Sequence, residues 1–218
     1  MHIPIEYKRG FVKFINCKID LSQKTLIPRI ETTYWVKQSI KKLLNTKNAK
    51  LNILDIFSGS GCIGIDILKN IKFSYVDFID LDKKAIKQIK INLALNQISL
   101  NRFNIFHSNL FNKLKKQKYD YIFANPPYVA KEKLDQVQES VKKYEPKLAW
   151  YGGKNGMYTI KKFLKNAQTF LINRGTIFME IDPFQKNEIT ILCKKLNYSS
   201  WIFHQDQFQK IRFVEINT

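Results

Sequence analysis

The sequence predicts an α/β protein with a seven-stranded, mostly parallel, doubly wound sheet, the last strand antiparallel, and a short N-terminal hairpin and helix lead. Two observations support this prediction. Short apolar runs alternate with longer segments of helical periodicity, the pattern of repeated strand–helix units. The first unit also has a glycine-rich turn between its strand and its helix, as doubly wound sheets do. We assign residues 1–45 to the N-terminal lead and residues 46–218 to the main domain.

Apolar runs rich in strand-forming residues indicate the strands, and the last two are close enough in sequence to pair antiparallel. The strands are expected at Leu51–Phe57, Ser74–Asp80, Phe103–His107, Tyr119–Ala124, Gly175–Ile181, Trp201–Phe203 and Arg212–Ile216. Apolar residues at helical spacing predict helices at Tyr34–Leu44, Cys62–Leu68, Lys83–Asn96, Glu132–Lys143, Tyr158–Leu171 and Phe184–Leu196. In the N-terminal lead, Phe11–Ile15 alternates like one arm of a hairpin, and Thr32 or Thr33 is placed to cap the first of these helices.

The composition indicates a folded protein of a reducing compartment. Hydrophobic residues make up 44% of the 218 positions, which is enough for a large core. Three distant cysteines without a CxxC pair suggest neither a metal site nor a disulfide, and neither a signal peptide nor a membrane span is visible. We therefore expect a cytoplasmic monomer that binds no metal and no membrane.

The formal net charge of +19 raises nucleic acid or ribosome contact as a possibility. Lysine supplies most of the 37 basic residues, however, and isoleucine, asparagine and phenylalanine are also abundant. An AT-rich genome produces this combination without any selection for binding of nucleic acid. The charge therefore leaves both interpretations open.

The first strand of the sheet ends at a turn suited to a nucleotide-like ligand. Glycines in this turn allow the backbone to approach a ligand closely, and the aspartate at the strand end can reach a polar group. The residues expected to contact the ligand are Asp55, Gly59 and Gly61. The turn lacks the complete GxGxxG fingerprint, so a tight strand–helix turn without a ligand is the alternative, and the absence of GK[ST] excludes a phosphate loop.

Polar residues also end the next two strands. Asp80 follows the turn by a little under 20 residues, where a carboxylate accepts hydrogen bonds from both hydroxyls of a ribose. The alternative for Asp80 is a charge at a helix N-terminus, but Asp82 is better placed for that function. After the third strand, Asn109 is suited to an adenine amino group, and Leu110 or Phe111 is suited to packing against the adenine ring.

The segment Asn125-Pro126-Pro127-Tyr128 ends the strand Tyr119–Ala124 abruptly. Proline cannot donate to a sheet ladder, so the two prolines stiffen the loop and leave its carbonyls without local N–H partners. The Asn125 side chain and the Pro126 carbonyl then form two fixed acceptors for one planar NH2 group, and Tyr128 supplies an aromatic face. We expect all four residues to bind the substrate, and Asn125, Pro126 and Tyr128 to act in catalysis.

Arg29 and Glu31 precede the first predicted helix of the chain. One interpretation is a solvated ion pair at the start of that helix. The other is a lid over the ligand, in which case both residues belong to the substrate-binding site.

Together, these segments resemble the HemK-type release-factor glutamine N5-methyltransferases, which are class I S-adenosylmethionine-dependent methyltransferases with a Rossmann-like fold. The resemblance covers nearly the whole chain. Its markers are Leu26–Thr32, Asp55–Gly64, Asp80, Asn125–Tyr128, Tyr144–Ala149 followed by Gly152–Gly156, and Met179–Ile181 followed by Gln185. Asn-Pro-Pro-Tyr also occurs in DNA adenine-N6 and rRNA guanine-N2 methyltransferases. The segments Leu26–Thr32 and Tyr144–Gly156 therefore distinguish this family from the others better.

The resemblance implies that Phe57–Gly61 and Asp80 hold S-adenosylmethionine, that Asn109 and Leu110 border the adenine, and that Asn125–Tyr128 hold the glutamine of the release factor's Gly-Gly-Gln motif. Asn125 then lies beside the cofactor as well. This sequence departs from the family at Phe57, where a glycine is usual, and at Asn109, where an aspartate is usual. We expect these departures to weaken cofactor affinity without abolishing it.

Such enzymes usually carry an N-terminal helical domain that helps to grip the release factor. Here the lead before Leu26 is short, so we expect docking of the protein substrate to rest on the catalytic domain. The alternative function is methylation of N6 of adenine or N2 of guanine in rRNA or DNA. A third class is a non-catalytic RNA-binding or assembly protein on a degenerate methyltransferase fold.

Overall fold

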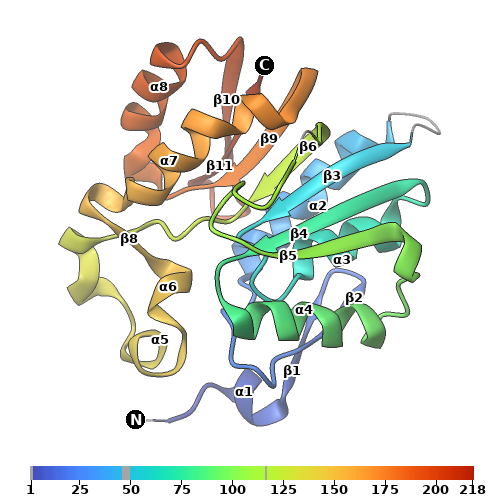
Figure 1. Cartoon of the computed structure of the whole chain (residues 1–218). Helices are drawn as coiled ribbons and strands as arrows, with labels where there is room; N and C mark the ends of the chain where they lie inside the picture. The colour runs from blue at the N-terminus through green and yellow to red at the C-terminus, as the bar shows by residue number, and fades with distance from the viewer. Residues whose placement is uncertain (1, 46–49, 116) are drawn as a thin grey trace.

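The computed structural model describes residues 2–45, 50–115 and 117–218 and has the predicted sheet (Figure 1). The strand order is β10-β11-β9-β6-β3-β4-β5, and β11 alone runs antiparallel to its neighbours β9 and β10. This confirms the prediction of a seven-stranded, mostly parallel sheet. The strands are β3 Leu51–Ile56, β4 Ser74–Asp80, β5 Phe103–His107, β6 Tyr119–Ala124, β9 Leu171–Glu180, β10 Ser200–Gln205 and β11 Ile211–Asn217.

Two hydrophobic clusters cover the two faces of the sheet, because successive side chains of a strand point to opposite faces. Ile53 of β3 belongs to the cluster with α2, α3 and α4, whereas Leu54 belongs to the cluster with α7 and α8. These helices are α2 Ile30–Leu44, α3 Cys62–Asn70, α4 Lys83–Leu95, α7 Tyr158–Ala167 and α8 Lys186–Lys195. Short 3-10 helices lie at Leu100–Arg102, Lys154–Gly156, Gln168–Phe170 and Pro183–Gln185.

The N-terminal lead consists of α1 Ile5–Arg9 and an antiparallel hairpin of β1 Phe11–Phe14 and β2 Cys17–Asp20, as the alternation of Phe11–Ile15 predicted. Side-chain amides of α4 bind the outer edge of β2. Asn92 Oδ1 accepts from the Asp20 N–H at 2.7 Å, and the Asn96 amide pairs with both the N–H and the carbonyl of Lys18. The predicted boundary between positions 45 and 46 falls on residues 46–49, which are outside the described residues.

Helix α2 begins earlier than predicted, at Ile30 instead of Tyr34, and the predicted caps are wrong. Arg29 occupies the N-cap position, and no side chain caps the helix there. Thr33 donates its hydroxyl to the Arg29 carbonyl at 3.1 Å. Thr32 lies inside the first turn, where its buried hydroxyl donates to a carboxylate at the end of β9 instead of to the helix backbone.

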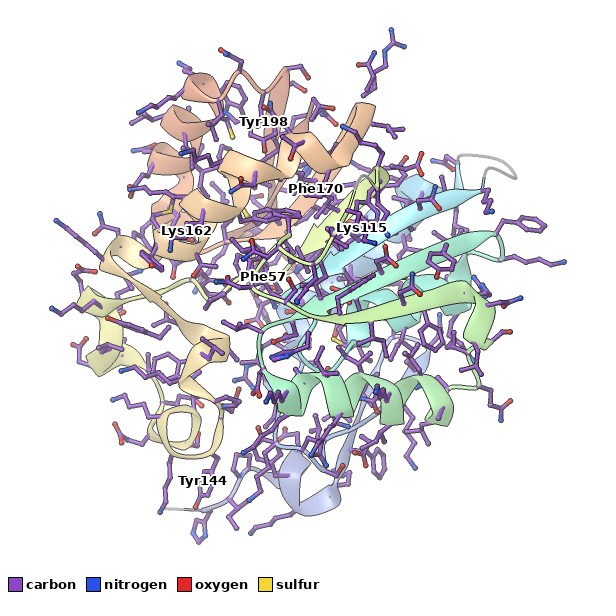
Figure 2. The ribbon with its side chains drawn as sticks, in the orientation of Figure 1. Phe57, Lys115, Tyr144, Lys162, Phe170 and Tyr198 are labelled. Carbon is purple, nitrogen blue, oxygen red and sulfur yellow. The ribbon has the colours of Figure 1, made fainter. Side chains whose placement is uncertain are left out.

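The connector after the Asn-Pro-Pro-Tyr segment, residues 129–156, is called the flap here. The single helix predicted for Glu132–Lys143 is wrong, because the chain forms a 3-10 helix at Lys131–Gln136 and then α5 at Glu139–Tyr144. The 3-10 segment is itself kinked at Lys133, which has non-helical backbone angles. In Figure 2, Tyr144 marks the outer tip of the flap, away from the sheet. The remaining elements of the flap are β7 Val129–Ala130, α6 Lys147–Trp150 and β8 Tyr151–Gly153.

The two ends of the flap are fastened to each other. Strands β7 and β8 pair in parallel. The buried Gln185 side chain donates to the carbonyls of Tyr128, at 3.2 Å, and Gly156, at 3.1 Å. Gly156 has a φ of +66°, and a Cβ there would lie 2.0 Å from the Tyr128 carbonyl oxygen. Only glycine therefore fits where the flap returns to the Asn-Pro-Pro-Tyr segment.

We expect Gly156→Ala to destabilise the protein more than Gly10→Ala, by an additional ~1 to 3 kcal/mol of unfolding free energy. Both glycines have a positive φ, but nothing lies within 4 Å of a Cβ built at Gly10. The difference between the two variants therefore isolates the collision with Tyr128 from the backbone strain. Urea unfolding measures it, and equal losses in the two variants would contradict the close approach.

Trp35 is the aromatic centre of one face of the sheet, and we expect Trp35→Ala to cost about 3 to 5 kcal/mol of unfolding free energy. Its ring is 0% exposed and stacks on Phe123 and Phe213, with centroids 6.0 and 5.7 Å away. The matched control is Phe73→Ala, since Phe73 is 51% exposed and should cost below ~1 kcal/mol. Similar losses in the two variants by urea unfolding would show that Trp35 does not organise this face.

Candidate active site

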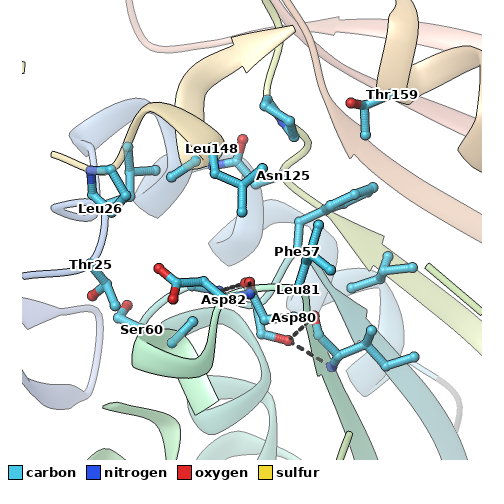
Figure 3. Close-up of a pocket in the computed structure, with 18 of the residues that line it drawn as sticks. Thr25, Leu26, Phe57, Ser60, Asp80, Leu81, Asp82, Asn125, Leu148 and Thr159 are labelled. Atoms are coloured by element: carbon cyan, nitrogen blue, oxygen red, sulfur yellow. Dashed lines mark hydrogen bonds between the residues drawn. The ribbon is translucent and has the colours of Figure 1, made fainter. Parts of the chain in front are cut away.

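A cavity of about 260 Å³ lies at the carboxyl ends of β3, β4, β5 and β6 (Figure 3). Open α/β sheets bind ligands at this edge. The cavity brings together most of the residues that the sequence predicted for a nucleotide-like ligand. Those that line it are Phe57, Ser58, Gly59, Ser60, Asp80, Asn109, Leu110 and Asn125.

Asp80, labelled in Figure 3, is fixed in this cavity by two backbone hydrogen bonds. One carboxylate oxygen accepts from the Gly59 N–H at 2.8 Å, and the other accepts from the Asp82 N–H at 2.8 Å. Burial raises the pKa of Asp80, and these bonds oppose the shift. Asp82 caps α4 by accepting from the Lys84 N–H, as predicted, so the lone pairs that remain on Asp80 are available to a ligand.

Phe57 adopts the left-handed conformation that glycine would favour, with a φ of +62°. This strain is offset by packing, because its ring meets Phe163 edge-on at 5.7 Å. Figure 2 shows Phe57 near the middle of the molecule, below Phe170 in this view. The turn therefore keeps its glycine-like shape although it begins with a phenylalanine. Leu110, in the loop that follows β5, also has a positive φ, of +48°.

Asp55 and Gly61, both predicted to bind the ligand, lie behind the wall of this cavity instead of lining it. Asp55 is 0% exposed, and one of its oxygens accepts from the Gly64 N–H at 2.9 Å. Burial raises the pKa of Asp55 to about 8. The Gly61 N–H donates to the Ser58 carbonyl at 2.7 Å, which closes the turn. Both residues shape the turn, and direct contact of either with a ligand stays a prediction.

Two buried hydroxyls in the cavity have no hydrogen-bond partner among the described residues. They belong to Thr25, which the sequence reasoning missed, and to Ser60. Figure 3 shows both on the same side of the cavity as the carboxylate of Asp82. A buried hydroxyl without a partner is costly, so these groups are suited to a polar part of a ligand.

A second cavity, of about 300 Å³, adjoins the first, and Leu26, Asn125 and Ala149 line both. Tyr128 and Pro126 line the second cavity, whereas Pro127 lines the first, and the binding of substrate by these residues stays a prediction. Further lining residues that the sequence reasoning did not select are Lys133, Gln136, Val137, Val141, Trp150, Glu180 and Asp182. Asn125 therefore stands where the two cavities meet.

The groups expected to accept a substrate NH2 are available for it. Asn125 donates through Nδ2 to Thr32 Oγ1 at 3.5 Å. Within the described part of the chain, no group donates to the Asn125 amide oxygen or to the Pro126 carbonyl. The predicted pair of acceptors therefore remains free beside the second cavity.

Glu180 is a further candidate for the site, and the sequence indicated it only as part of the family marker Met179–Ile181. It ends β9 beside the end of β6, and it is 1% exposed. Its carboxylate accepts from the Thr32 hydroxyl at 2.6 Å, the Trp35 indole N–H at 2.7 Å and the Tyr128 hydroxyl at 2.9 Å. Burial raises the pKa of Glu180, and the three donors oppose this shift. A carboxylate at a strand end next to the Asn125 strand was the signal that could have identified it.

The structure separates Arg29 from Glu31. Arg29 lines the second cavity and forms an ion pair of 2.5 Å with the buried Glu145 of the flap. The interpretation of a solvated Arg29–Glu31 pair is therefore wrong, because the partner of Arg29 is Glu145. Glu31 lines neither of the two cavities described here. Arg29 thus connects the N-terminal segment to the flap next to the predicted substrate site.

The described residues lack the features of two other classes of site. They contain no group of three or more histidine, cysteine, aspartate or glutamate side chains suited to a metal ion. No helix among them has both the length and the apolar character needed to cross a membrane. Cys17, Cys62 and Cys193 are buried free thiols.

Comparison with known proteins agrees with this geometry. The family model of the methyltransferase small domain matches residues 36–212. The release factor glutamine methyltransferase of Thermodesulfovibrio yellowstonii is 37% identical over 85% of this chain and 66% of its own length. That of Flavobacterium psychrophilum is 32% identical over 98% of this chain and 75% of its own length. The chain thus spans about two thirds to three quarters of these two relatives.

The fold is also shared with more distant solved structures. The 16S rRNA N2 G1207 methyltransferase of T. thermophilus, in complex with AdoMet and guanosine, has a TM-score of 0.67 at 14% identity. That alignment covers 95% of this chain and 49% of the other. With its sheet order, its cavity at the strand ends and its closer relatives, this chain belongs to the methyltransferase small-domain family, among the release factor glutamine methyltransferases.

Proposed function

We propose that this protein methylates the side-chain amide nitrogen of the glutamine in the Gly-Gly-Gln motif of a peptide chain release factor, with S-adenosylmethionine as the methyl donor. The names of its relatives support this substrate. The observation that carries the proposal is the position of Asn125, which lines both cavities and keeps its amide oxygen free of donors from the described residues. One cavity then serves the methyl donor and the other serves the glutamine.

The residues of the first cavity fit S-adenosylmethionine. The fixed carboxylate of Asp80 suits the two ribose hydroxyls, and Leu110 offers an apolar surface to the adenine. The unpartnered hydroxyls of Thr25 and Ser60 suit the polar end of the methionyl part. The bound cofactor supplies an electrophilic methyl group on a positively charged sulfur.

The residues of the second cavity fit a glutamine side chain. The amide nitrogen is a poor nucleophile, because its lone pair is delocalised into the carbonyl. The Asn125 amide oxygen and the Pro126 carbonyl accept its two hydrogens, which polarises the nitrogen and turns it toward the first cavity. The ring of Tyr128, held by its hydroxyl on Glu180, packs on the amide plane. Asn125 and Pro126 would thus hold the nitrogen toward the methyl group that S-adenosylmethionine would supply, and water would take the surplus N–H proton.

Methylation of an amino group in rRNA or DNA is the alternative that the same Asn-Pro-Pro-Tyr segment allows. The net charge of +19 favours it, but the relatives that cover most of this chain are named for release factor glutamine. The solved structure that acts on rRNA shares the fold at 14% identity, which does not transfer its substrate.

The proposal is tested by incubating the protein with radiolabelled S-adenosylmethionine and a recombinant release factor, with rRNA and DNA in parallel reactions. We expect the label on the release factor, and mass spectrometry should place one methyl group on the motif glutamine. The matched control is the same release factor with alanine in place of that glutamine, which should take up no label. Label on nucleic acid alone would refute the proposal in favour of the alternative.

The two cavities should respond differently to substitution. We expect Asn125→Ala to reduce kcat by roughly 100-fold or more with nearly unchanged cofactor affinity, because it removes a positioned polar group at the reacting nitrogen. Asp80→Ala should instead weaken cofactor binding about 10-fold or more, because it removes a charged acceptor from the cavity. Calorimetry with S-adenosylhomocysteine and steady-state kinetics separate the two effects. Equal loss of binding and of turnover in both variants would contradict this division.

A further inference from the structure

A chain of hydrogen bonds runs from the end of β9 to the amide of Asn125. Glu180 accepts from Thr32, and Thr32 in turn accepts from Asn125 Nδ2. We propose that Glu180 and Thr32 are positioning residues that determine which end of the Asn125 side chain faces the substrate. This inference rests on the proposed function and adds to it the source of the orientation of Asn125.

The direction of the chain follows from its donors. An indole N–H can only donate, so Glu180 Oε2 accepts from Trp35, and the same oxygen accepts from the Thr32 hydroxyl. Thr32 has a single hydroxyl hydrogen, which it donates to Glu180 Oε2, and the two oxygens are 2.6 Å apart. Only lone pairs remain on Thr32 for Asn125, so the NH2 of Asn125 faces Thr32. The amide oxygen of Asn125 is therefore left to face the substrate.

The opposite orientation would prevent binding of the substrate. If the Thr32 hydroxyl were free to donate to the Asn125 oxygen, the Asn125 amide could rotate by half a turn. It would then present its own NH2 to the NH2 of the glutamine, and two donors would face each other. The buried carboxylate of Glu180 prevents this because it holds the Thr32 hydrogen.

The three residues joined by these hydrogen bonds lie on, or directly after, three different secondary-structure elements. Glu180 ends β9, Thr32 lies in the first turn of α2, and Asn125 follows β6. Glu180 and Thr32 are 1% and 2% exposed, so water does not replace their hydrogen bond. Glu180 also holds the Tyr128 hydroxyl, and one carboxylate therefore positions both side chains that are expected at the substrate amide.

The test is a double-mutant cycle between Thr32 and Asn125 on methyl transfer to the release factor. We expect Thr32→Val to lower kcat roughly 10-fold with the affinity for S-adenosylhomocysteine unchanged, and Thr32→Ser to stay within about 3-fold of wild type. In the Asn125→Ala background, Thr32→Val should add less than about 2-fold, because there is no amide left to orient. The matched control is Thr33→Val, which removes a neighbouring hydroxyl that donates to the N-cap carbonyl of Arg29.

Losses that multiply in the double variant would overturn the proposal, and so would a Thr32→Ser variant as impaired as Thr32→Val. Thermal unfolding and the Thr32→Ser variant separate positioning from a folding defect. A second readout needs no activity: the NMR signals of the Asn125 side-chain NH2, identified by their loss in Asn125→Ala. They should shift in Thr32→Val and not in Thr33→Val. If wild type fails to methylate the release factor, the proposed function fails, while these signals still decide the orientation of Asn125.

Discussion

A carboxylate in a protein interior is stable only with hydrogen-bond donors around it, and in this protein that requirement joins the fold to the site. Glu180 takes its donors from Thr32 and Trp35 on α2 and from Tyr128 after β6. The helix that covers one face of the sheet is thereby tied to the loop that holds the predicted acceptors. Core packing and site geometry are therefore not independent here, since Trp35 takes part in both.

The site is divided in two by a loop that cannot join the sheet. Strand β6 ends just before Asn125 and the two prolines, and Asn125 lines both cavities. The flap closes the second cavity from the other side, and it is held by Gln185 at one end and by the ion pair of Arg29 with Glu145. The ligands proposed for the two cavities would meet beside Asn125, and in-line transfer would require the amide nitrogen and the methyl group to face each other directly there.

Much of the site was predictable because parallel strands align their carboxyl ends at one edge. Polar residues at the ends of such strands therefore gather at that edge, as do Asp80 of β4 and Asn125 after β6, the two strands that flank β3. The side chains behind that edge were not predictable from local patterns. Whether Asp55 faces the cavity or the Gly64 N–H depends on the exact path of the turn, and the partner of Arg29 lies 116 residues away in the flap. Periodicity carries no information on contacts of that range.

The N-terminal hairpin has one strand edge covered by side chains, which protects it from pairing with another molecule. An open strand edge is a template for pairing with a strand of another molecule. Here the carboxamides of Asn92 and Asn96 imitate a neighbouring strand, since each offers a donor and an acceptor to the backbone of β2. That side of the ribbon is thus closed to self-association by a helix, with no third strand needed.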